Sequence, residues 1–277
     1  MSDVPFTTPA AESGSFMTVT SANHFDKQAD FTDHVVSSLH RNREYHEFIF
    51  NDVPPSWADA VYQHIDEIIP SRKSYNSESR ELRIRVKPTE ILDCIQPWLF
   101  KQPLNWLLNG DITLQEVELF DPGVGTTLFF KSGPYSGSWK EPDFFFRPNN
   151  LILPTTAVES GWSESKELLR NGMDLSLVGG NGSINVVIIV QWTRLQERVS
   201  GTVELFVRDK NGMPTLQQSE PIFPRPAAPN NLSIKRRDLF GPALVPGRNG
   251  NDTLYLDLER LRNYATRGLG FMNLVPS

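Results

Sequence analysis

The stretch from Lys140 to Trp192 decides the fold, and it reads KEPDFFFRPNNLILPTTAVESGWSESKELLRNGMDLSLVGGNGSINVVIIVQW. Two short apolar segments come first, one beginning at Asp143 and one ending at Glu159, and a helical segment and a longer apolar run follow. This order predicts strand, strand, helix, strand. Because successive side chains of a strand alternate between its faces, each acid shares a face with apolar residues of its own strand.

The two acids can converge at the rim of the sheet if their strands are neighbours. Carboxylate oxygens at such a point suit a hard cation, Mg²⁺ or Mn²⁺, that keeps several waters. A cation held in this way polarises a phosphodiester and lowers the pKa of a bound water, which then becomes a nucleophile near neutral pH. Asp143 and Glu159 are therefore candidate metal ligands of a hydrolytic site.

Pro142-Asp143, followed sixteen residues later by Glu159 at the end of an apolar strand, resembles the restriction-endonuclease-like PD-(D/E)XK superfamily. The segment 158–165 is similar to the branch related to the Uma2-type endonuclease-like proteins. The resemblance covers roughly residues 112–193. It implies an α/β fold with a mixed sheet flanked by helices, two metal-binding acids, and a lysine that orients or activates the attacking water. It also implies a nucleic-acid substrate, DNA in preference to RNA.

The motif lysine is missing from its usual place, two residues after the second acid, where this chain has Gly161. In the superfamily this lysine can move to the following helix. We therefore expect Lys166 to take the role here. Lys140 and Gln191 are weaker substitutes. Two functions follow. The first is a Mg²⁺-dependent endonuclease with the two acids and Lys166 in catalysis. The second is a catalytically inactive nuclease-fold module that serves for binding or self-association, including pairing as a homodimer.

The segment after the second acid predicts a crossover unit. Ser163 can cap a helix that ends at Gly179-Gly180, and apolar residues recur along it four positions apart. The unbroken run 186–190 predicts a strand covered on both faces. Parallel strands joined through a helix are almost always connected with right-handed geometry, so the acids and the crossover belong to one sheet.

Residues 111–120 predict a further strand, with a turn at 121–123 and an antiparallel partner at 125–131. Glu116 faces the same side as the apolar residues of this strand and is the candidate third metal ligand. A solvent-facing strand position explains the same residue equally well.

Three regions are expected along the chain. Residues 1–30, rich in Ser, Thr, Ala and Pro without an apolar period, predict a flexible N-terminal arm. Residues 31–110 predict a mainly helical part that packs on the core as an N-terminal extension. Residues 111–277 predict the nuclease-like core, which ends in a hairpin around Asn211-Gly212 and a helix over 258–269.

Within the N-terminal part, the residues after Ser56 predict a helix that Pro70 ends. Residues 72–80 predict a loop, and the alternation over 82–86 predicts a strand ended by Pro88. Prolines within 89–108 predict a kinked or broken helix.

The composition is ordinary for a globular protein of 277 residues, with 39% hydrophobic and 22% charged residues. No apolar run approaches the roughly 18–20 residues needed to cross a bilayer, and the N-terminus lacks a signal-peptide pattern. We therefore expect an intracellular protein, in the nucleus or cytoplasm, with no membrane partner. The single cysteine, Cys94, excludes an internal disulfide and a cysteine-rich zinc site.

The formal net charge of −6 disfavours a nucleic-acid partner, because affinity for phosphates comes mostly from Lys and Arg. Four acids and one lysine within residues 1–30 account for −3 of this charge. The rest of the chain is closer to balance and can hold a local basic groove. All five histidines precede Lys140, which disfavours a histidine-rich metal centre at the site.

Overall fold

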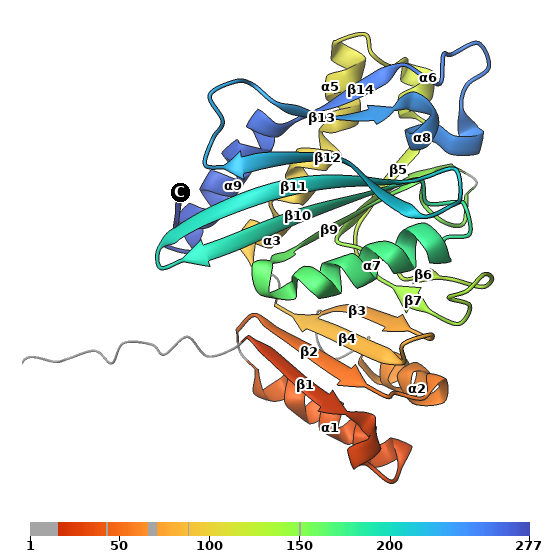
Figure 1. Ribbon diagram of the computed structural model, residues 1–277, viewed down its shortest axis with the longest axis vertical. Helices are drawn as coiled ribbons and strands as arrows, with labels where there is room; N and C mark the ends of the chain where they lie inside the picture. The colour runs from red at the N-terminus through yellow and green to blue at the C-terminus, as the bar shows by residue number, and fades with distance from the viewer. Residues whose placement is uncertain (1–15, 43, 66–70, 88, 150) are drawn as a thin grey trace, which may run out of the picture.

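The computed structural model describes residues 16–277 except 43, 66–70, 88 and 150. Within these residues a seven-stranded sheet, here called the central sheet, has the order β12-β11-β10-β9-β8-β5, with β15 beside β11 (Figure 1). Its strands are β5 (Phe120–Gly123), β8 (Phe144–Pro148), β9 (Thr156–Trp162), β10 (Val186–Leu195), β11 (Arg198–Arg208), β12 (Pro214–Phe223) and β15 (Val275–Pro276).

A second sheet of the described chain, here called the N-terminal sheet, has six strands in the order β1-β2-β4-β3-β7-β6. Its strands are β1 (Met17–Ser21), β2 (His46–Asn51), β3 (Ser71–Asn76), β4 (Glu81–Val86), β6 (Leu128–Phe129) and β7 (Trp139–Lys140). Helix α7 (Lys166–Gly179) lies between the two sheets (Figure 1). A small antiparallel pair, β13 (Asn231–Lys235) and β14 (Thr253–Asp257), lies at the far end of the molecule.

The predicted crossover unit is confirmed. Strand β8 pairs antiparallel with β9, and β9 continues through α7 into the parallel strand β10. The 3₁₀ turn η2 (Ser163–Ser165) precedes α7, whose residues Leu169 and Met173 are buried. The expected α/β class, with mixed sheets flanked by helices, is therefore observed.

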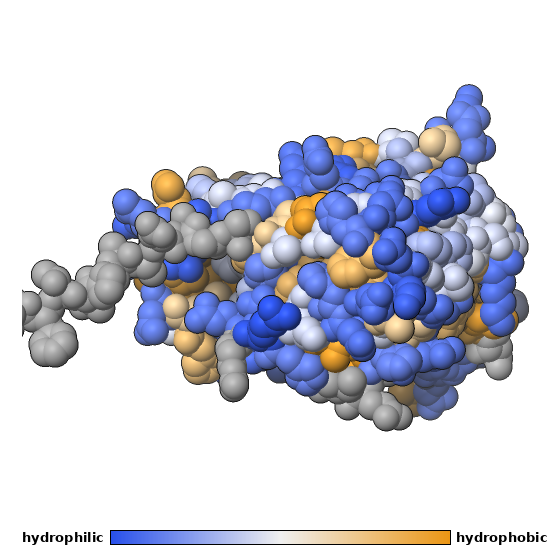
Figure 2. All heavy atoms as spheres, turned by 90° about the horizontal axis from the view of Figure 1, so that it is seen from below, coloured by the Kyte–Doolittle hydropathy of each residue, from blue (hydrophilic) through white to orange (hydrophobic). Residues whose placement is uncertain are grey.

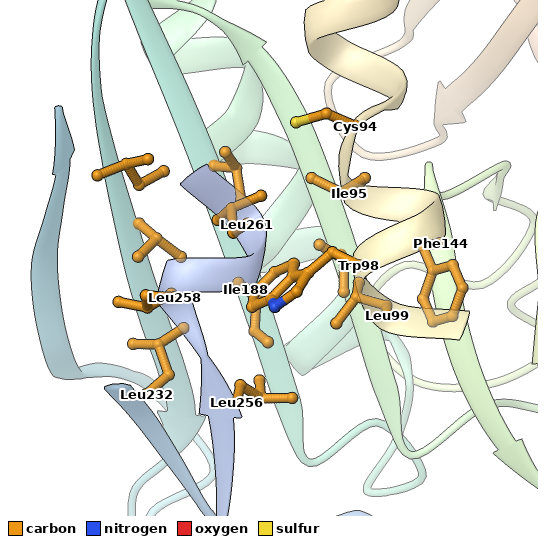
Figure 3. Close-up of a cluster of buried hydrophobic side chains, with 14 of the residues drawn as sticks. Cys94, Ile95, Trp98, Leu99, Phe144, Ile188, Leu232, Leu256, Leu258 and Leu261 are labelled. Atoms are coloured by element: carbon orange, nitrogen blue, oxygen red, sulfur yellow. The ribbon is translucent and has the colours of Figure 1, made fainter. Parts of the chain in front are cut away.

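Both faces of the central sheet are covered by apolar packing. Val186, Ile188 and Val190 point into one core, whereas Val187 and Ile189 point into a second core under α7. The first core is closed by α3 (Glu90–Asp93), α4 (Ile95–Phe100), α5 (Gln102–Leu108) and α9 (Leu258–Phe271). In Figure 3 the Trp98 side chain lies among the apolar side chains of this core, and its indole N–H donates to the Asp257 carbonyl at 2.8 Å.

The N-terminal sheet is mainly apolar on its outer face and mainly polar on its inner face. Leu82, Ile84 and Val86 of β4 pack on α1 (Gln28–Arg41) and α2 (Pro55–Ile65), which cover the face away from the central sheet. Because side chains alternate along a strand, Arg83 and Arg85 point to the inner face, toward α7 and the central sheet. From the side of these two helices, the surface is mainly hydrophilic with scattered hydrophobic patches (Figure 2).

Several expectations for the N-terminal part were wrong. The arm over residues 1–30 is contradicted by β1 and by α1, which begins at Gln28; residues 1–15 of the arm lie outside the described residues. The mainly helical segment 31–110 also holds β2, β3 and β4, and the loop predicted over 72–80 is largely β3. Strand β3 shows no apolar alternation because its outer face holds Ser71 and Lys73 beside Tyr75, while its inner face is polar throughout. The predicted ends at Pro70 and Pro88 lie outside the described residues.

Residues 111–120 do not form the predicted strand. They hold α6 (Leu114–Val117), which begins with a capping box in which Thr113 and Glu116 exchange side-chain and backbone hydrogen bonds. The expected turn at 121–123 belongs to β5, which pairs with β8. The predicted partner at 125–131 contributes only β6, in the other sheet.

The C-terminal expectations are confirmed. Strands β11 and β12 form the predicted hairpin, and α9 follows β14 directly. The Asp257 carboxylate caps α9 by accepting hydrogen bonds from the backbone N–H groups of Glu259 and Arg260. A short helix, α8 (Arg236–Phe240), follows β13.

Across the described ranges, no helix is both long and apolar enough to span a membrane.

Helix α9 offers a matched pair of glycines for testing the packing of this core. A Cβ added at Gly268 would lie 2.9 Å from the Glu90 carbonyl oxygen, whereas a Cβ at Gly270 would meet no atom within 4 Å. Gly268→Ala should therefore lower the free energy of unfolding by about 1–3 kcal/mol, because the backbone of α3 or of α9 must move to make room for the methyl group. Gly270→Ala should raise it by roughly 0.4–1 kcal/mol through the entropy of the unfolded chain. Urea unfolding of both variants tests this, and equal effects would contradict the close approach of α3 and α9.

Candidate functional site

Asp143 and Glu159 lie next to each other on the central sheet. Asp143 directly precedes β8, and its backbone N–H donates to the Val158 carbonyl of β9 at 3.1 Å. The register pairs Phe144 with Val158, so Asp143 stands opposite Glu159. The two residues are 3% and 5% exposed. The structure thus brings together the two acids that were far apart in the sequence, in a buried position.

Both carboxylate oxygens of Asp143 are engaged. Oδ2 accepts a hydrogen bond from the Ser160 N–H at 2.8 Å, and Oδ1 accepts one from the Arg85 guanidinium. The second terminal nitrogen of Arg85 donates to the Ser160 carbonyl at 2.6 Å. Arg72 Nε lies 3.9 Å from Asp143 Oδ1. A single guanidinium therefore joins β4 of the N-terminal sheet to both β8 and β9.

Glu159 is paired with a lysine that the sequence ranked second. Its Oε1 lies 2.8 Å from Lys140 Nζ, in a buried ion pair. Lys140 Nζ also donates to the Gly172 carbonyl of α7 at 2.7 Å. Burial raises the pKa of the Glu159 carboxyl, and the charge of Asp143 acts in the same direction, against the opposing effect of Lys140. The carboxyl therefore holds its proton to a higher pH than an exposed glutamate does.

Strand β7 and a glycine of α7 place the Lys140 ammonium. Trp139 points into the outer core, so Lys140, the next residue, points inward. A Cβ at position 172 would lie 2.5 Å from Lys140 Nζ, so only glycine leaves room for the ammonium in its observed position. In a sequence, a glycine in the middle of a predicted helix can indicate that another group approaches the helix closely at that position.

Lys166 and Gln191 occupy different positions from Lys140. Lys166 is the first residue of α7, and its side chain is exposed. Among the residues that the structure describes, the lysine ammonium within 4.0 Å of a candidate acid is that of Lys140. Gln191 pairs with Gly161 in the register of β9 and β10.

Glu116 lies away from the other two acids. It sits in α6 and forms ion pairs with Arg236 and Arg248 of the C-terminal region. Burial alone would raise the pKa of Glu116, but the Thr113 backbone hydrogen bond and Arg236 outweigh it, and the net shift is downward. Its environment is that of a structural ion pair, so the structure does not bring the third predicted ligand to the site.

A further acid, Glu47 of β2, was not identified from the sequence. It is fully buried, and its Oε1 accepts hydrogen bonds from Tyr45 and from Ser165 Oγ, the latter at 2.8 Å. Arg83 Nη2 donates to Glu47 Oε2 at 2.6 Å. Burial alone would raise the pKa of Glu47, but Arg83 and Arg85 reverse the shift, so its pKa is lowered. Glu47 thus links the N-terminal sheet to the turn that begins α7.

These contacts form a layer of charged side chains between the two sheets, here called the charged layer. Its members are Glu47, Arg83, Arg85, Lys140, Asp143 and Glu159. A cleft of about 40 Å³ opens beside it, with room for a few water molecules. Its charged lining consists of Arg72, Lys73, Arg83, Arg85, Lys140, Glu81, Glu141 and Glu159. Glu47 and Asp143, which pair with Arg83 and Arg85, bring the acids to the same number as the cations.

The oxygen atoms of this site suit a hard cation. Within residues 16–277, apart from the gaps noted above, no group of three or more His, Cys, Asp or Glu residues could hold a metal ion. The available donors are the two carboxylates and the Ser160 carbonyl, and a Mg²⁺ site usually takes one or two carboxylates and keeps waters. Asp143 Oδ1 and the Ser160 carbonyl already converge on a positive group, the Arg85 guanidinium. The donor set therefore fits a divalent ion in place of that guanidinium.

No protein-family model and no curated protein sequence matches this chain. The chemistry of the charged layer is therefore the basis for assigning it a function.

Proposed function

We propose that the chain is a metal-dependent phosphodiesterase of the restriction-endonuclease-like kind, acting on nucleic acid and on DNA in preference to RNA. The observation that carries the proposal is the pairing of Asp143 and Glu159 on adjacent strands, with the Lys140 ammonium 2.8 Å from Glu159. Two acids and a lysine at one point are the components that the resemblance to PD-(D/E)XK nucleases implies.

Asp143, Glu159 and the Ser160 carbonyl would hold Mg²⁺ or Mn²⁺. The bound ion would polarise the phosphodiester and lower the pKa of a nearby water. Lys140 takes the role that was assigned to Lys166, because it reaches Glu159 from β7. Its ammonium orients the attacking water and offsets negative charge that develops on the phosphate. The Gly172 carbonyl, which accepts from Lys140 at 2.7 Å, keeps this amine in place.

The cleft beside the charged layer contains cations that an anionic ligand could contact. Arg72 and Arg83 line it together with Lys140, and cations attract and orient the phosphates of a nucleic-acid backbone.

A second candidate function is a catalytically inactive nuclease-fold module for binding or self-association. The observation that favours it is the engagement of both Asp143 oxygens by protein donors, at a residue only 3% exposed. An acid that is satisfied in this way can serve the fold alone.

Nicking of plasmid DNA separates the two candidates. With Mg²⁺ or Mn²⁺ the wild-type protein should nick, and Asp143→Asn and Glu159→Gln should remove the activity, because each loses a metal ligand. Lys140→Met should reduce the rate by about 100-fold or more, the scale of a positioned proton-transfer group. Lys166→Met is the matched control and should nick at the wild-type rate.

Three results would count against the proposal. Nicking that persists in both acid variants would place the activity elsewhere. Loss in Lys166→Met but not in Lys140→Met would restore the lysine that the sequence favoured. A wild-type protein that is folded by circular dichroism yet does not nick in either metal would support the inactive module.

The pH dependence of metal binding tests the role of Lys140. The raised pKa of Glu159 means that its ionised form, which binds the cation, becomes populated only above the usual value of 4.5. Affinity for Mn²⁺ should therefore rise with pH through this pKa. Lys140→Met removes the ammonium that lowers the pKa, so the midpoint should move to higher pH.

Calorimetric titration with Mn²⁺ between about pH 4 and 8 measures this midpoint. Lys166→Met again serves as the control and should leave the midpoint in place. A midpoint that is the same in Lys140→Met and wild type would show that Lys140 does not act on Glu159 in solution.

A further inference from the structure

We infer that the Arg85 guanidinium occupies the metal position when no metal is bound. The guanidinium and the divalent ion then compete for the same oxygens. The inference rests on the proposed function, because it concerns the ion that the function requires. It assigns Arg85 the role of a residue that sets metal affinity, distinct from the residues that bind the ion.

The contacts of Arg85 coincide with the donor set of the site. Its two terminal nitrogens donate to Asp143 Oδ1 and to the Ser160 carbonyl. Its Nε is buried and has no hydrogen-bond partner in the described part of the chain. The side chain is 4% exposed, so its charge must be balanced by neighbouring groups rather than by water. The guanidinium is therefore held mainly by the oxygens that a divalent ion would need.

The Arg85 guanidinium and a metal ion cannot occupy the same position at the same time. Asp143 Oδ2 already accepts from the Ser160 N–H, so Oδ1 is the oxygen through which this carboxylate binds a cation. A metal on Oδ1 and on the Ser160 carbonyl would place two positive groups at one point, which electrostatic repulsion prevents in a buried site. Metal binding therefore requires the guanidinium to move.

The N-terminal sheet provides a second acid to which the displaced guanidinium can turn. Arg85 and Glu47 are directly opposed in the antiparallel pair of β4 and β2, so their Cβ atoms lie within roughly 4.5–5.5 Å. Glu47 already accepts four hydrogen bonds, from Tyr45, from Ser165 and two from Arg83, so it would attract the displaced guanidinium through its charge and not through a free lone pair. Arg85 thus contacts one acid, Asp143, and has a second acid, Glu47, on the neighbouring strand toward which it can move.

Affinity for Mn²⁺ in Arg85→Gln tests the competition. The glutamine keeps hydrogen-bond donors at the position and removes the charge. Its affinity for Mn²⁺, measured by calorimetric titration, should exceed that of wild type by roughly tenfold or more, the scale on which one opposite charge changes proton binding by a carboxylate. The Mn²⁺-induced rise in melting temperature should increase in parallel. Adding Asp143→Asn to Arg85→Gln should abolish the gain.

Arg236→Gln is a matched control. Arg236 is 2% exposed and, like Arg85, binds a carboxylate and a backbone carbonyl, those of Glu116 and Asp111; it also lies 3.5 Å from a second carboxylate, that of Asp252. Its loss should destabilise the fold without changing Mn²⁺ affinity. If Arg85→Gln does not fold, Arg85→Lys keeps the buried charge but contacts one oxygen at a time, and it should still bind Mn²⁺ more tightly than wild type does.

The outcomes separate this inference from the proposed function. Equal Mn²⁺ affinity in wild type and in the folded Arg85 variants, with weaker binding in Asp143→Asn, would overturn the competition and leave the metal site standing. A gain of the same size in Arg236→Gln would also overturn it, as a general effect of loosening the fold. Absence of Mn²⁺ binding in wild type and in every Arg85 variant would overturn the proposed function itself.

Discussion

Charges buried between the two sheets have to be neutralised by one another, and this requirement holds the two halves of the molecule in register. Asp143 of the central sheet is balanced by Arg85 of the N-terminal sheet, and Glu159 is balanced by Lys140. Removing one partner of a buried pair leaves an uncompensated charge, at a cost of about 3–5 kcal/mol. The relative position of the sheets therefore depends on these pairs.

Apolar packing stabilises the layers on either side, while the charged layer between them specifies the site. The cores under α1 and α2, under α7, and under α9 contain the large buried side chains. Apolar side chains in place of the charged layer would often stabilise the fold more, because buried ion pairs often contribute less to stability than hydrophobic residues of similar volume. Retention of several ionised groups at one interface favours a chemical role for it.

The sequence predicted the central part of the fold well, because β8, β9 and β10 are short apolar runs and α7 has apolar residues four positions apart. It located both acids but not their partners. The alternation of Leu82, Ile84 and Val86 with arginines indicated a strand, yet it could not indicate what the polar face would contact. Lys140 was ranked below Lys166 because the resemblance places a displaced motif lysine on the following helix. The two-residue strand that carries Lys140 leaves no periodic signal that could have corrected this. Glu116 could have been placed better, since Thr113 and Glu116 have the spacing of a capping box.

Gly172 acts as a spacer between α7 and β7. Even one methyl group at this position would come within 2.5 Å of the Lys140 ammonium and push it away from Glu159. The helix thereby positions the ammonium in two ways, by the space left at Gly172 and by the Gly172 carbonyl, which accepts a hydrogen bond from it. In a homologous protein, a larger residue at this position of the helix would indicate that the lysine ammonium lies farther from the acid.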